Sequence, residues 1–253
     1  MNKIVLITGA TSGFGKACAE KFAANQFDVI ITGRRKDRLE SVKTALEEKF
    51  RVNVLTLCFD VQQKKKVFST IENLPEQWKK IDVLINNAGL ALGRDLFDKA
   101  SLDDWETMID TNVKGLLWVS RAVLPFMIAA GSGLVINIGS TAAKEVYEKG
   151  NVYCASKFAV DAISKAMRID LLPHRIKVTA IHPGAAETEF SLVRFKQDEA
   201  QAAKIYEGYK ALQASDIAEA AFFCAQQPSH VCINELVITC TAQANSYYTY
   251  KSL

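Results

Sequence analysis

Histidine is scarce in this sequence. Among 253 residues there are only three, His174, His182 and His230, and they are scattered along the chain. The six cysteines form no C-x-x-C pair, and no histidine–cysteine cluster has the spacing of zinc ligands. We therefore predict no metal site, and we expect free, mostly buried thiols in a reducing compartment.

The chain also lacks a strong charge of either sign. Its 31 Lys and Arg residues nearly balance 28 Asp and Glu residues, which gives a net charge of +3. The longest basic run, 64–66, lies in a polar, helix-like stretch and is interpreted as a solvated surface. This balance is too mild to suggest a nucleic-acid-binding surface.

Long hydrophobic runs are absent as well. No apolar run approaches the roughly 20 residues that a membrane span needs, and no apolar signal core precedes the first expected strand. We expect a soluble, cytoplasmic protein that does not bind membranes. There is no internal repeat, low-complexity tract or linker rich in proline and glycine, so one domain is expected over residues 1–253.

What the chain does contain is a regular alternation of two patterns. Short, nearly continuous apolar runs, typical of strands covered on both faces, alternate with segments of helical spacing. This predicts an α/β fold: a Rossmann-like, doubly wound parallel sheet of about seven strands with helices on both faces. The expected strands are 4–8, 29–33, 52–59, 83–86, 134–139, 176–182 and 235–239. The expected helices are 16–25, 36–49, 63–74, 102–130, 152–171 and 215–226.

One segment, 187–210, interrupts this rhythm. It is polar, carries isolated aromatic residues, and lies between the sixth expected strand and the last expected helix. A substrate lid suits that position, and a plain surface excursion suits it equally well.

A glycine-rich loop follows the first expected strand and opens a helix. Its glycines, Gly9, Gly13 and Gly15, have the spacing G-x-x-x-G-x-G. Glycine lets the backbone turn sharply and approach a pyrophosphate, which the positive end of the helix then favours. A glycine loop alone is weak evidence, but its place between strand and helix predicts dinucleotide binding.

Two arginines, Arg34 and Arg35, follow the second expected strand. A site that prefers NAD places an acidic residue here to hold the ribose hydroxyls, whereas an arginine accommodates a 2′-phosphate. The pattern therefore predicts NADP(H) as the cofactor; the alternative is that both arginines point into water.

Tyr153 and Lys157 are four residues apart, so they share one face of the expected helix. An ammonium group near a phenol favours the phenolate and lowers the tyrosine pKa from its usual ~10. Such a phenol can exchange a proton near neutral pH. Taken alone, the pair fits an ordinary helix better than a catalytic one.

Further motifs occur in order along the chain. Asp60-Val61 follows the third strand, Asn86-Asn87-Ala88-Gly89 the fourth, and Pro183-Gly184 the sixth. Ser140 stands just past the fifth strand, thirteen residues before Tyr153. Together with the glycine loop and the Tyr153–Lys157 pair, this order and spacing resembles the short-chain dehydrogenase/reductase family over essentially the whole chain.

The resemblance implies a catalytic role for four residues. Tyr153 is expected to be the general acid or base at the reacting oxygen, and Lys157 to lower its pKa and hold the nicotinamide ribose. Ser140 is expected to hydrogen-bond the reacting oxygen, and Asn112 to anchor a water in the proton relay. The residues expected at the cofactor are Gly9, Thr11, Ser12, Gly13, Phe14, Gly15, Arg34, Arg35, Asp60, Val61, Asn87, Ala88, Gly89, Tyr153, Lys157, Pro183, Gly184, Ala186 and Thr188.

Within the family, three stretches (87–93, 150–153 and 187–195) are similar to NADP-dependent 3-hydroxy acid dehydrogenases, which oxidise L-serine and related acids. A hydroxy-acid carboxylate needs a cationic partner, for which Arg194 is the candidate and Lys196 the reserve; the alternative is an arginine that clamps its own loop. Tyr147 is expected to line the substrate pocket with Ser140, or else to be structural.

Some positions depart from the family's usual pattern. Phe14 replaces a common isoleucine, Ala185-Ala186 replaces a bulkier pair, and Lys144 and Glu145 bring charge into a segment that is usually small. These departures leave a broad-specificity NADPH-dependent carbonyl reductase as an alternative. A dinucleotide-sensing binding protein that has lost the reaction is a remote one.

Family members are usually homotetramers or dimers, so a homo-oligomer is expected, with a tetramer favoured. The resemblance implies that the helices 102–130 and 152–171 form the interface. The aromatic tail 246–250 is expected to pack either on a neighbouring subunit or on its own domain.

Overall fold

Within residues 2–252, which the computed structural model describes, seven strands form one central sheet. They consist mainly of β-branched and aliphatic residues, which suit a pleated surface buried on both faces. The strands are β1 (Ile4–Ile7), β2 (Asp28–Gly33), β3 (Val54–Cys58), β4 (Ile81–Asn86), β5 (Gly133–Ile138), β6 (Ile176–Pro183) and β7 (Glu235–Ile238).

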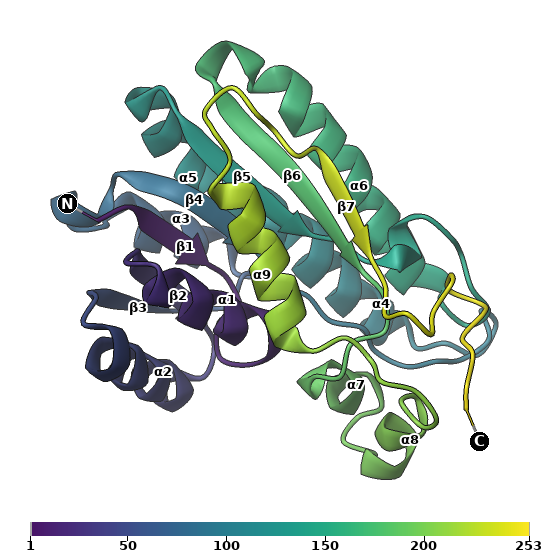
Figure 1. The fold of residues 1–253 in the computed structure, drawn as a ribbon. Coiled ribbons are helices and arrows are strands. Elements are labelled where there is room, and N and C mark those ends of the chain that lie inside the picture. The colour runs from purple at the N-terminus through teal and green to yellow at the C-terminus, as the bar shows by residue number, and fades with distance from the viewer. Residues whose placement is uncertain (1, 253) are drawn as a thin grey trace.

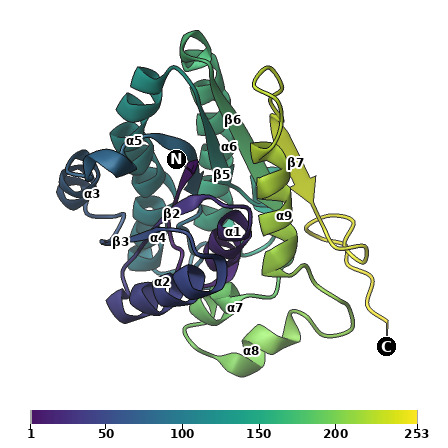
Figure 2. The same cartoon turned by 60° about the vertical axis from the view of Figure 1, so that its left-hand side comes forward.

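Helices connect the strands and cover both faces of the sheet (Figures 1 and 2). They are α1 (Gly13–Ala24), α2 (Lys36–Phe50), α3 (Lys64–Glu72), α4 (Leu102–Ile109), α5 (Leu116–Ala130), α6 (Asn151–Asp170), α7 (Glu189–Arg194), α8 (Glu199–Lys204) and α9 (Ala214–Ala225). Short 3₁₀ turns lie at η1 (Glu76–Trp78), η3 (Thr141–Ala143) and η4 (Leu172–His174), and η2 (Asp110–Gly115) is a π-helical turn.

The strands are all parallel, in the order β3-β2-β1-β4-β5-β6-β7. The chain therefore winds outwards from β1 to β3, then returns to β4 on the other side of β1. The predicted doubly wound fold is confirmed. Such a reversal of strand order opens a crevice at the carboxyl ends of the strands, where ligands bind in open α/β sheets.

Alternate residues of each strand belong to two hydrophobic cores. In β1, Val5 and Ile7 face the core formed with α1, α2 and α9, whereas Ile4 and Leu6 face the core formed with α3 and α5. Phe22 of α1 packs edge-to-face on Phe222 of α9, with ring centroids 5.4 Å apart. Each fully buried aliphatic side chain contributes about 1.5–3 kcal/mol, so the sheet forms a rigid base for its loops.

The helical stretch Leu102–Ala130 differs from the single regular helix that its spacing predicted. It is continuous, but the six residues of η2 widen it into a π-turn between α4 and α5. Turns of this kind are often found at functional sites. Gly131, with φ of 64°, ends α5 in the left-handed conformation that glycine favours.

Among the described residues, this same stretch is long and apolar enough to cross a membrane, judged by length and composition alone. The expectation that no apolar stretch has such a length is therefore wrong for it. Core helices of soluble proteins share this length and composition, and α5 packs on α3 and β4.

Other differences from the predicted elements lie at boundaries. The third strand is shorter than predicted, and α1 begins at Gly13 inside the glycine loop. The segment 187–210 contains two helices that spacing did not predict, α7 and α8. A local signal for α7 exists, since the Thr188 hydroxyl accepts a hydrogen bond from the Phe190 amide at 3.2 Å and caps the helix.

Candidate active site

A cavity of about 970 Å³ lies at the carboxyl ends of the strands. Its walls come from the loops after β1 to β6, from α6, α7 and α8, and from the C-terminal segment. Most residues predicted at the cofactor or substrate line this one cavity: Gly9, Thr11, Ser12, Gly13, Phe14, Arg34, Arg35, Asp60, Val61, Asn87, Ala88, Gly89, Ser140, Tyr147, Tyr153, Lys157, Pro183, Gly184, Ala186, Thr188 and Arg194.

Three predicted residues lie elsewhere. Gly15 and Asn112 are buried in the structure that supports the cavity rather than in its lining. Lys196, the reserve candidate for a substrate carboxylate, also lies outside the lining, and its Nζ is 3.0 Å from the Asp104 carboxylate. Its charge is therefore directed to the protein surface.

The glycine loop is tightly packed against the end of β4. A Cβ at Gly15 would lie 2.4 Å from the Gly9 carbonyl oxygen and 2.5 Å from Asn87 Nδ2. The side-chain Nδ2 of Asn87 donates a hydrogen bond to the Thr8 carbonyl at 2.8 Å and so connects this loop to the end of β4. With Gly9 at φ of 66°, the main chain lines the cavity directly at the N-terminus of α1. This cradle fits the pyrophosphate of a dinucleotide.

Basic side chains gather beyond the end of β2. Arg35 donates to the Thr11 hydroxyl at 2.7 Å and lies 3.2 Å from the Glu189 carboxylate. Arg38 reaches the same carboxylate at 2.8 Å. Burial works to raise the pKa of Glu189, but the hydrogen bonds from Arg35 and Arg38 outweigh it and lower that pKa below its ordinary value. Arg34 lies 3.3 Å from Asp60.

Tyr153 and Lys157 lie one turn apart on α6, and both side chains are buried. Lys157 Nζ donates to the Ile138 carbonyl at 3.0 Å and lies 5.9 Å from the centroid of the Tyr153 ring. Both residues border the cavity together with Ser140. The geometry therefore brings a phenol, an ammonium and a hydroxyl to one end of the cradle.

Asn112 lies in the π-turn and forms three hydrogen bonds. Its Oδ1 accepts from the Leu90 amide at 2.8 Å, and its Nδ2 donates to the Leu90 carbonyl at 2.8 Å and to Ser156 Oγ at 3.0 Å. Asn112 thus links α4 and α5 both to the loop after β4 and to α6, which carries Tyr153.

The ionisation of the pair differs from the sequence expectation. Burial raises the pKa of Tyr153 above its ordinary value, although the Ser140 hydrogen bond and the Arg194 charge act to lower it. Burial also lowers the pKa of Lys157 to about 8. The expectation that Lys157 brings the phenol below its usual pKa is therefore wrong for this structure, because desolvation of the phenolate dominates.

Aromatic and basic side chains surround the space next to Tyr153. Arg194 donates to the Tyr147 hydroxyl at 3.0 Å, and its guanidinium lies 5.4 Å from the centroid of the Tyr153 ring. The Phe190 ring lies 5.7 Å from the same ring. Arg194 thus bonds a residue of another loop and borders the cavity, so it does not merely clamp its own segment. Burial raises the pKa of Tyr147, so its hydroxyl stays protonated.

Sequence reasoning missed several residues in and around the cavity. Arg38 stands three residues after Arg35 on α2, so helical spacing could have identified it. Arg94, Phe190, Tyr206 and Gln243 line the cavity without a local signal. Their positions depend on how segments far apart in the sequence pack together.

The aromatic tail packs on its own domain through its main chain. The Ser246 amide donates to the Glu145 carboxylate at 2.9 Å, the Tyr250 amide to the Ala242 carbonyl at 2.8 Å, and the Ser252 amide to the Gly208 carbonyl at 2.9 Å. The rings of Tyr247, Tyr248 and Tyr250 remain exposed.

Comparison with known proteins gives concordant results. Residues 3–199 match a family model described as short chain dehydrogenase. The chain is 50% identical to the NADP-dependent 3-hydroxy acid dehydrogenase YdfG of Salmonella typhi over 91% of this chain and 92% of that protein. It is 45% identical to sulfoacetaldehyde reductase 2 of Chromohalobacter salexigens over 98% of each. Among solved structures, the closed form of serine dehydrogenase complexed with NADP⁺ superposes with a TM-score of 0.92 at 43% identity, covering 99% of this chain and 100% of that one.

Proposed function

Because this chain belongs to the short-chain dehydrogenase family, we propose that it is an NADP(H)-dependent oxidoreductase. It interconverts small 3-hydroxy acids, such as L-serine, and the matching semialdehydes or ketones by hydride transfer. The observation that carries this proposal is the shared cavity: Tyr153, Lys157 and Ser140 lie at one end, and the arginines after β2 lie at the other.

The residues present fit NADP(H) as the cofactor. The glycine loop at the start of α1 would hold the pyrophosphate, and Arg35, with Arg34, would hold the 2′-phosphate. Asp60 and Val61 would border the adenine, while the main chain of Asn87–Gly89 and the segment from Pro183 to Thr188 would border the nicotinamide half. When bound, NADP(H) supplies or accepts the hydride.

The side chains of the protein provide the proton and the orientation. In the reducing direction, Tyr153 donates its phenolic proton to the carbonyl oxygen, and Ser140 donates a hydrogen bond to the same oxygen. Lys157 holds the ribose of the nicotinamide and stabilises the tyrosinate that the transfer leaves. Asn112 fixes α6 relative to the loop after β4 and anchors a water in the proton relay.

The ionisation of Tyr153 supports reduction near neutral pH. Because its pKa is raised, the phenol carries its proton at pH 7 and acts directly as an acid. Oxidation of a hydroxy acid needs the phenolate as base, so that direction benefits from higher pH.

Arg194 is the partner proposed for the substrate's acid group. Its guanidinium borders the cavity above the Tyr153 ring, and its hydrogen bond to Tyr147 orients it. A substrate carbonyl placed at Tyr153 therefore has a cation within the reach of a three- or four-carbon acid.

A second candidate function is reduction of a wider range of carbonyl compounds. The 45% identity to a protein named sulfoacetaldehyde reductase supports it, because a sulfonate offers the same anionic oxygens to Arg194. Turnover measured over a panel of substrates, with NADPH or NADP⁺, distinguishes the two functions. Turnover of L-serine, 3-hydroxybutyrate and malonic semialdehyde well above that of neutral ketones supports the first candidate.

Replacing Tyr153 by phenylalanine tests the catalytic proposal directly. We expect turnover to fall by about 10²–10⁴-fold, the usual contribution of general acid–base catalysis, with NADPH affinity within about threefold of the wild-type value. Near-normal turnover would remove Tyr153 from the mechanism. If the wild-type protein turned over no carbonyl or alcohol but bound NADPH tightly, this would instead favour a dinucleotide sensor.

Replacing Arg35 by alanine tests the cofactor proposal. Charge-assisted hydrogen bonds contribute about 1.5–3 kcal/mol, so the KM for NADPH should rise about 10- to 100-fold while the KM for NADH changes little. An equal change for both cofactors would contradict a role in holding the 2′-phosphate.

The proposal also includes a cytoplasmic homo-oligomer, with a tetramer favoured over a dimer. Exposed apolar residues support it, among them Val237 on the edge strand β7 and Ile169 near the end of α6. Light scattering coupled to gel filtration tests it, and a monomer at micromolar concentration would contradict it.

A further inference from the structure

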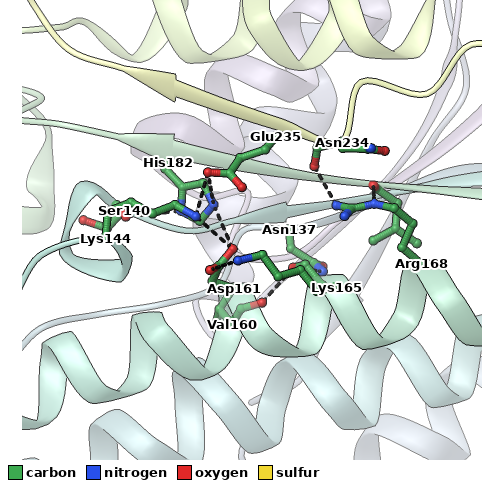
Figure 3. A network of polar contacts seen from close by, with 12 residues as sticks. Asn137, Ser140, Lys144, Val160, Asp161, Lys165, Arg168, His182, Asn234 and Glu235 are labelled. Atoms are coloured by element: carbon green, nitrogen blue, oxygen red, sulfur yellow. Dashed lines mark hydrogen bonds and ion pairs between the residues drawn. The ribbon is translucent and has the colours of Figure 1, made fainter.

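A partly buried polar network lies next to the Ser140 loop and is not used by the mechanism above (Figure 3). At its centre is His182, the last residue of β6 before Pro183, with no exposed surface. Its Nδ1 lies 3.2 Å from the Ser140 carbonyl oxygen, and its Nε2 lies 3.5 Å from Asp161 Oδ1. The ring is therefore hydrogen-bonded to the loop that carries Ser140, while its Nε2 faces Asp161 of α6 without a hydrogen bond.

The contact continues the sheet where the main chain cannot. The last ladder bond between β5 and β6 at this end runs from the Gly139 amide to the Ile181 carbonyl. Pro183, the next residue of β6 on the same side, has no N–H to extend the ladder. Beyond this point, the imidazole Nδ1 of His182 lies 3.2 Å from the Ser140 carbonyl oxygen. A side-chain donor therefore replaces the missing backbone donor.

Gly139 leaves room for this arrangement. A Cβ at Gly139 would lie 2.4 Å from His182 Nδ1, which no side chain tolerates. The neighbouring backbone groups are held as well, because Lys157 Nζ binds the Ile138 carbonyl at 3.0 Å. Three consecutive residues, from Ile138 to Ser140, are thus each fixed by a separate bond.

The acceptor at Nδ1 decides where the ring carries its proton. A carbonyl oxygen only accepts hydrogen bonds, so the ring nitrogen bonded to it must be the donor. Nε2, 3.5 Å from Asp161 Oδ1, forms no hydrogen bond. Burial and the charge of Lys144 lower the pKa of His182, although Glu235 and Asp161 act in the opposite direction. Near neutral pH the ring holds one proton, which lies on Nδ1.

Lysine side chains, and not a metal ion, supply the positive charge of this network. Asp161, His182 and Glu235 bring one ligand atom each within 4.8 Å of one another, close enough for a metal ion. Lys144 Nζ, however, already lies 2.6 Å from Glu235 and 3.1 Å from Asp161. The Asp161 carboxylate also receives Lys165 at 2.7 Å. Two ammonium groups therefore balance the two carboxylates that surround the neutral ring.

We propose that His182 is a positioning residue for Ser140: its Nδ1–H holds the Ser140 carbonyl, while the ring is fully buried against the Lys144–Asp161–Glu235 network. Freed from this bond, the carbonyl lets the backbone of Ser140 turn, and the hydroxyl loses its fixed place beside Tyr153. The inference rests on the proposed catalytic role of Ser140.

Two amide substitutions at His182 test this role. The amide nitrogen of asparagine can occupy the place of Nδ1, whereas that of glutamine occupies the place of Nε2. We expect kcat within about fivefold of wild type for His182→Asn, but a loss of tenfold or more for His182→Gln and His182→Leu. The Kd for NADPH should stay within about threefold in all three variants, and His230→Asn, at an exposed histidine, serves as the matched control.

The pattern among these variants is decisive. A kcat for His182→Gln equal to or above that of His182→Asn, or a wild-type kcat for His182→Leu, would overturn the proposal. Circular dichroism verifies the fold of each variant. Should His182→Leu fail to fold, the asparagine–glutamine pair still decides.

The tautomer provides a readout that does not depend on activity. With only three histidines in the chain, solid-state NMR of ¹⁵N-histidine-labelled protein at pH 7.5 can resolve each ring, and His182→Asn assigns the signal. We expect a neutral Nδ1–H ring; an Nε2–H tautomer or an imidazolium would overturn the proposal. Ser140→Ala with full turnover would instead contradict the proposed function, while leaving the observed tautomer unchanged.

Discussion

The Glu189 carboxylate at the start of α7 lies 3.2 Å from the Arg35 guanidinium, which is proposed to hold the 2′-phosphate of NADP(H). Arg38 binds the same carboxylate at 2.8 Å. A phosphate bound there would therefore compete with Glu189 for one set of guanidinium groups. Because Glu189 opens the segment that borders the substrate space, this competition links cofactor binding to the position of α7.

Replacing Glu189 by glutamine should strengthen NADPH binding. The variant removes the competing charge, and exposed ion pairs contribute about 0.2–1 kcal/mol, so we expect the Kd for NADPH to fall about 1.5- to 5-fold. The Kd for NADH should not change. Fluorescence titration of both cofactors measures this, with the exposed Glu187→Gln as control. Weaker NADPH binding in Glu189→Gln would show that Glu189 supports the site instead of competing for it.

Replacing Arg194 by leucine should discriminate between charged and neutral substrates. We expect the KM for succinic semialdehyde to rise about 10- to 100-fold, the equivalent of ~1.5–3 kcal/mol for a hydrogen bond to a charged group. Butanal, of the same length but without the carboxylate, should change less than threefold. Lys196→Leu, outside the cavity lining, is the matched control. A similar loss for both aldehydes would assign Arg194 a structural role.

The buried ammonium of Lys157 should make stability depend on pH in an identifiable way. Its folded-state pKa of about 8 is below its ordinary value, so the unfolded chain binds more protons from about pH 8 to 10. The free energy of unfolding contributed by Lys157 therefore rises with pH in this window, by at most about 1.4 kcal/mol per pH unit.

Comparison with Lys157→Met isolates this contribution. Burial raises the pKa of Cys18 to about 12, so the contribution of this thiol to the free energy of unfolding falls as pH rises. The fall is the same in both proteins, because both contain Cys18. Urea unfolding at pH 7, 8, 9 and 10 gives the difference between wild type and variant, which should increase with pH. A difference that is flat or decreasing would contradict the lowered pKa.

Removing Lys144 should destabilise the protein. Lys144→Met leaves the carboxylates of Asp161 and Glu235 without their shared cation. Breaking a fully buried pair costs ~3–5 kcal/mol, but 27% of the Lys144 side chain is exposed. We therefore expect a loss of about 1–3 kcal/mol in the free energy of unfolding.

Urea unfolding measures the effect of Lys144→Met, and Lys65→Met, at an exposed site, provides the control. Adding Glu235→Gln to Lys144→Met should recover part of the loss, because it removes one of the two unbalanced charges. No recovery in the double variant would mean that packing of the lysine stem, and not its charge, is what matters.

The parts of the site that sequence could predict are those that follow strands directly. Gly9, Asn87 and Ser140 each stand at the carboxyl end of a parallel strand, and a parallel sheet brings all such ends to one edge. Arg35 and the pair on α6 likewise follow from local spacing. Backbone periodicity and motif order therefore determine the cradle.

The remainder depends on contacts between segments far apart in the chain. Glu189 meets Arg35 across 154 residues, and Lys144, which seemed out of place in the sequence, meets Glu235 on β7. The direction of the Tyr153 pKa shift was mispredicted for the same reason. Burial depends on the packing of the whole domain, and four-residue spacing contains no information about it.

The π-turn at Asp110–Gly115 gives the long helix a spare residue. A π-turn is equivalent to one residue inserted into an α-helix. Removing that residue would leave the flanking helices α4 and α5 in the same relative orientation. Deleting a single residue there would restore regular winding, and the face of α5 that packs on the sheet would keep its orientation. The asparagine at position 112 would lose its reach to Leu90. A one-residue deletion in the π-turn would therefore remove the Asn112 anchor while keeping the packing of α5 on α3 and β4.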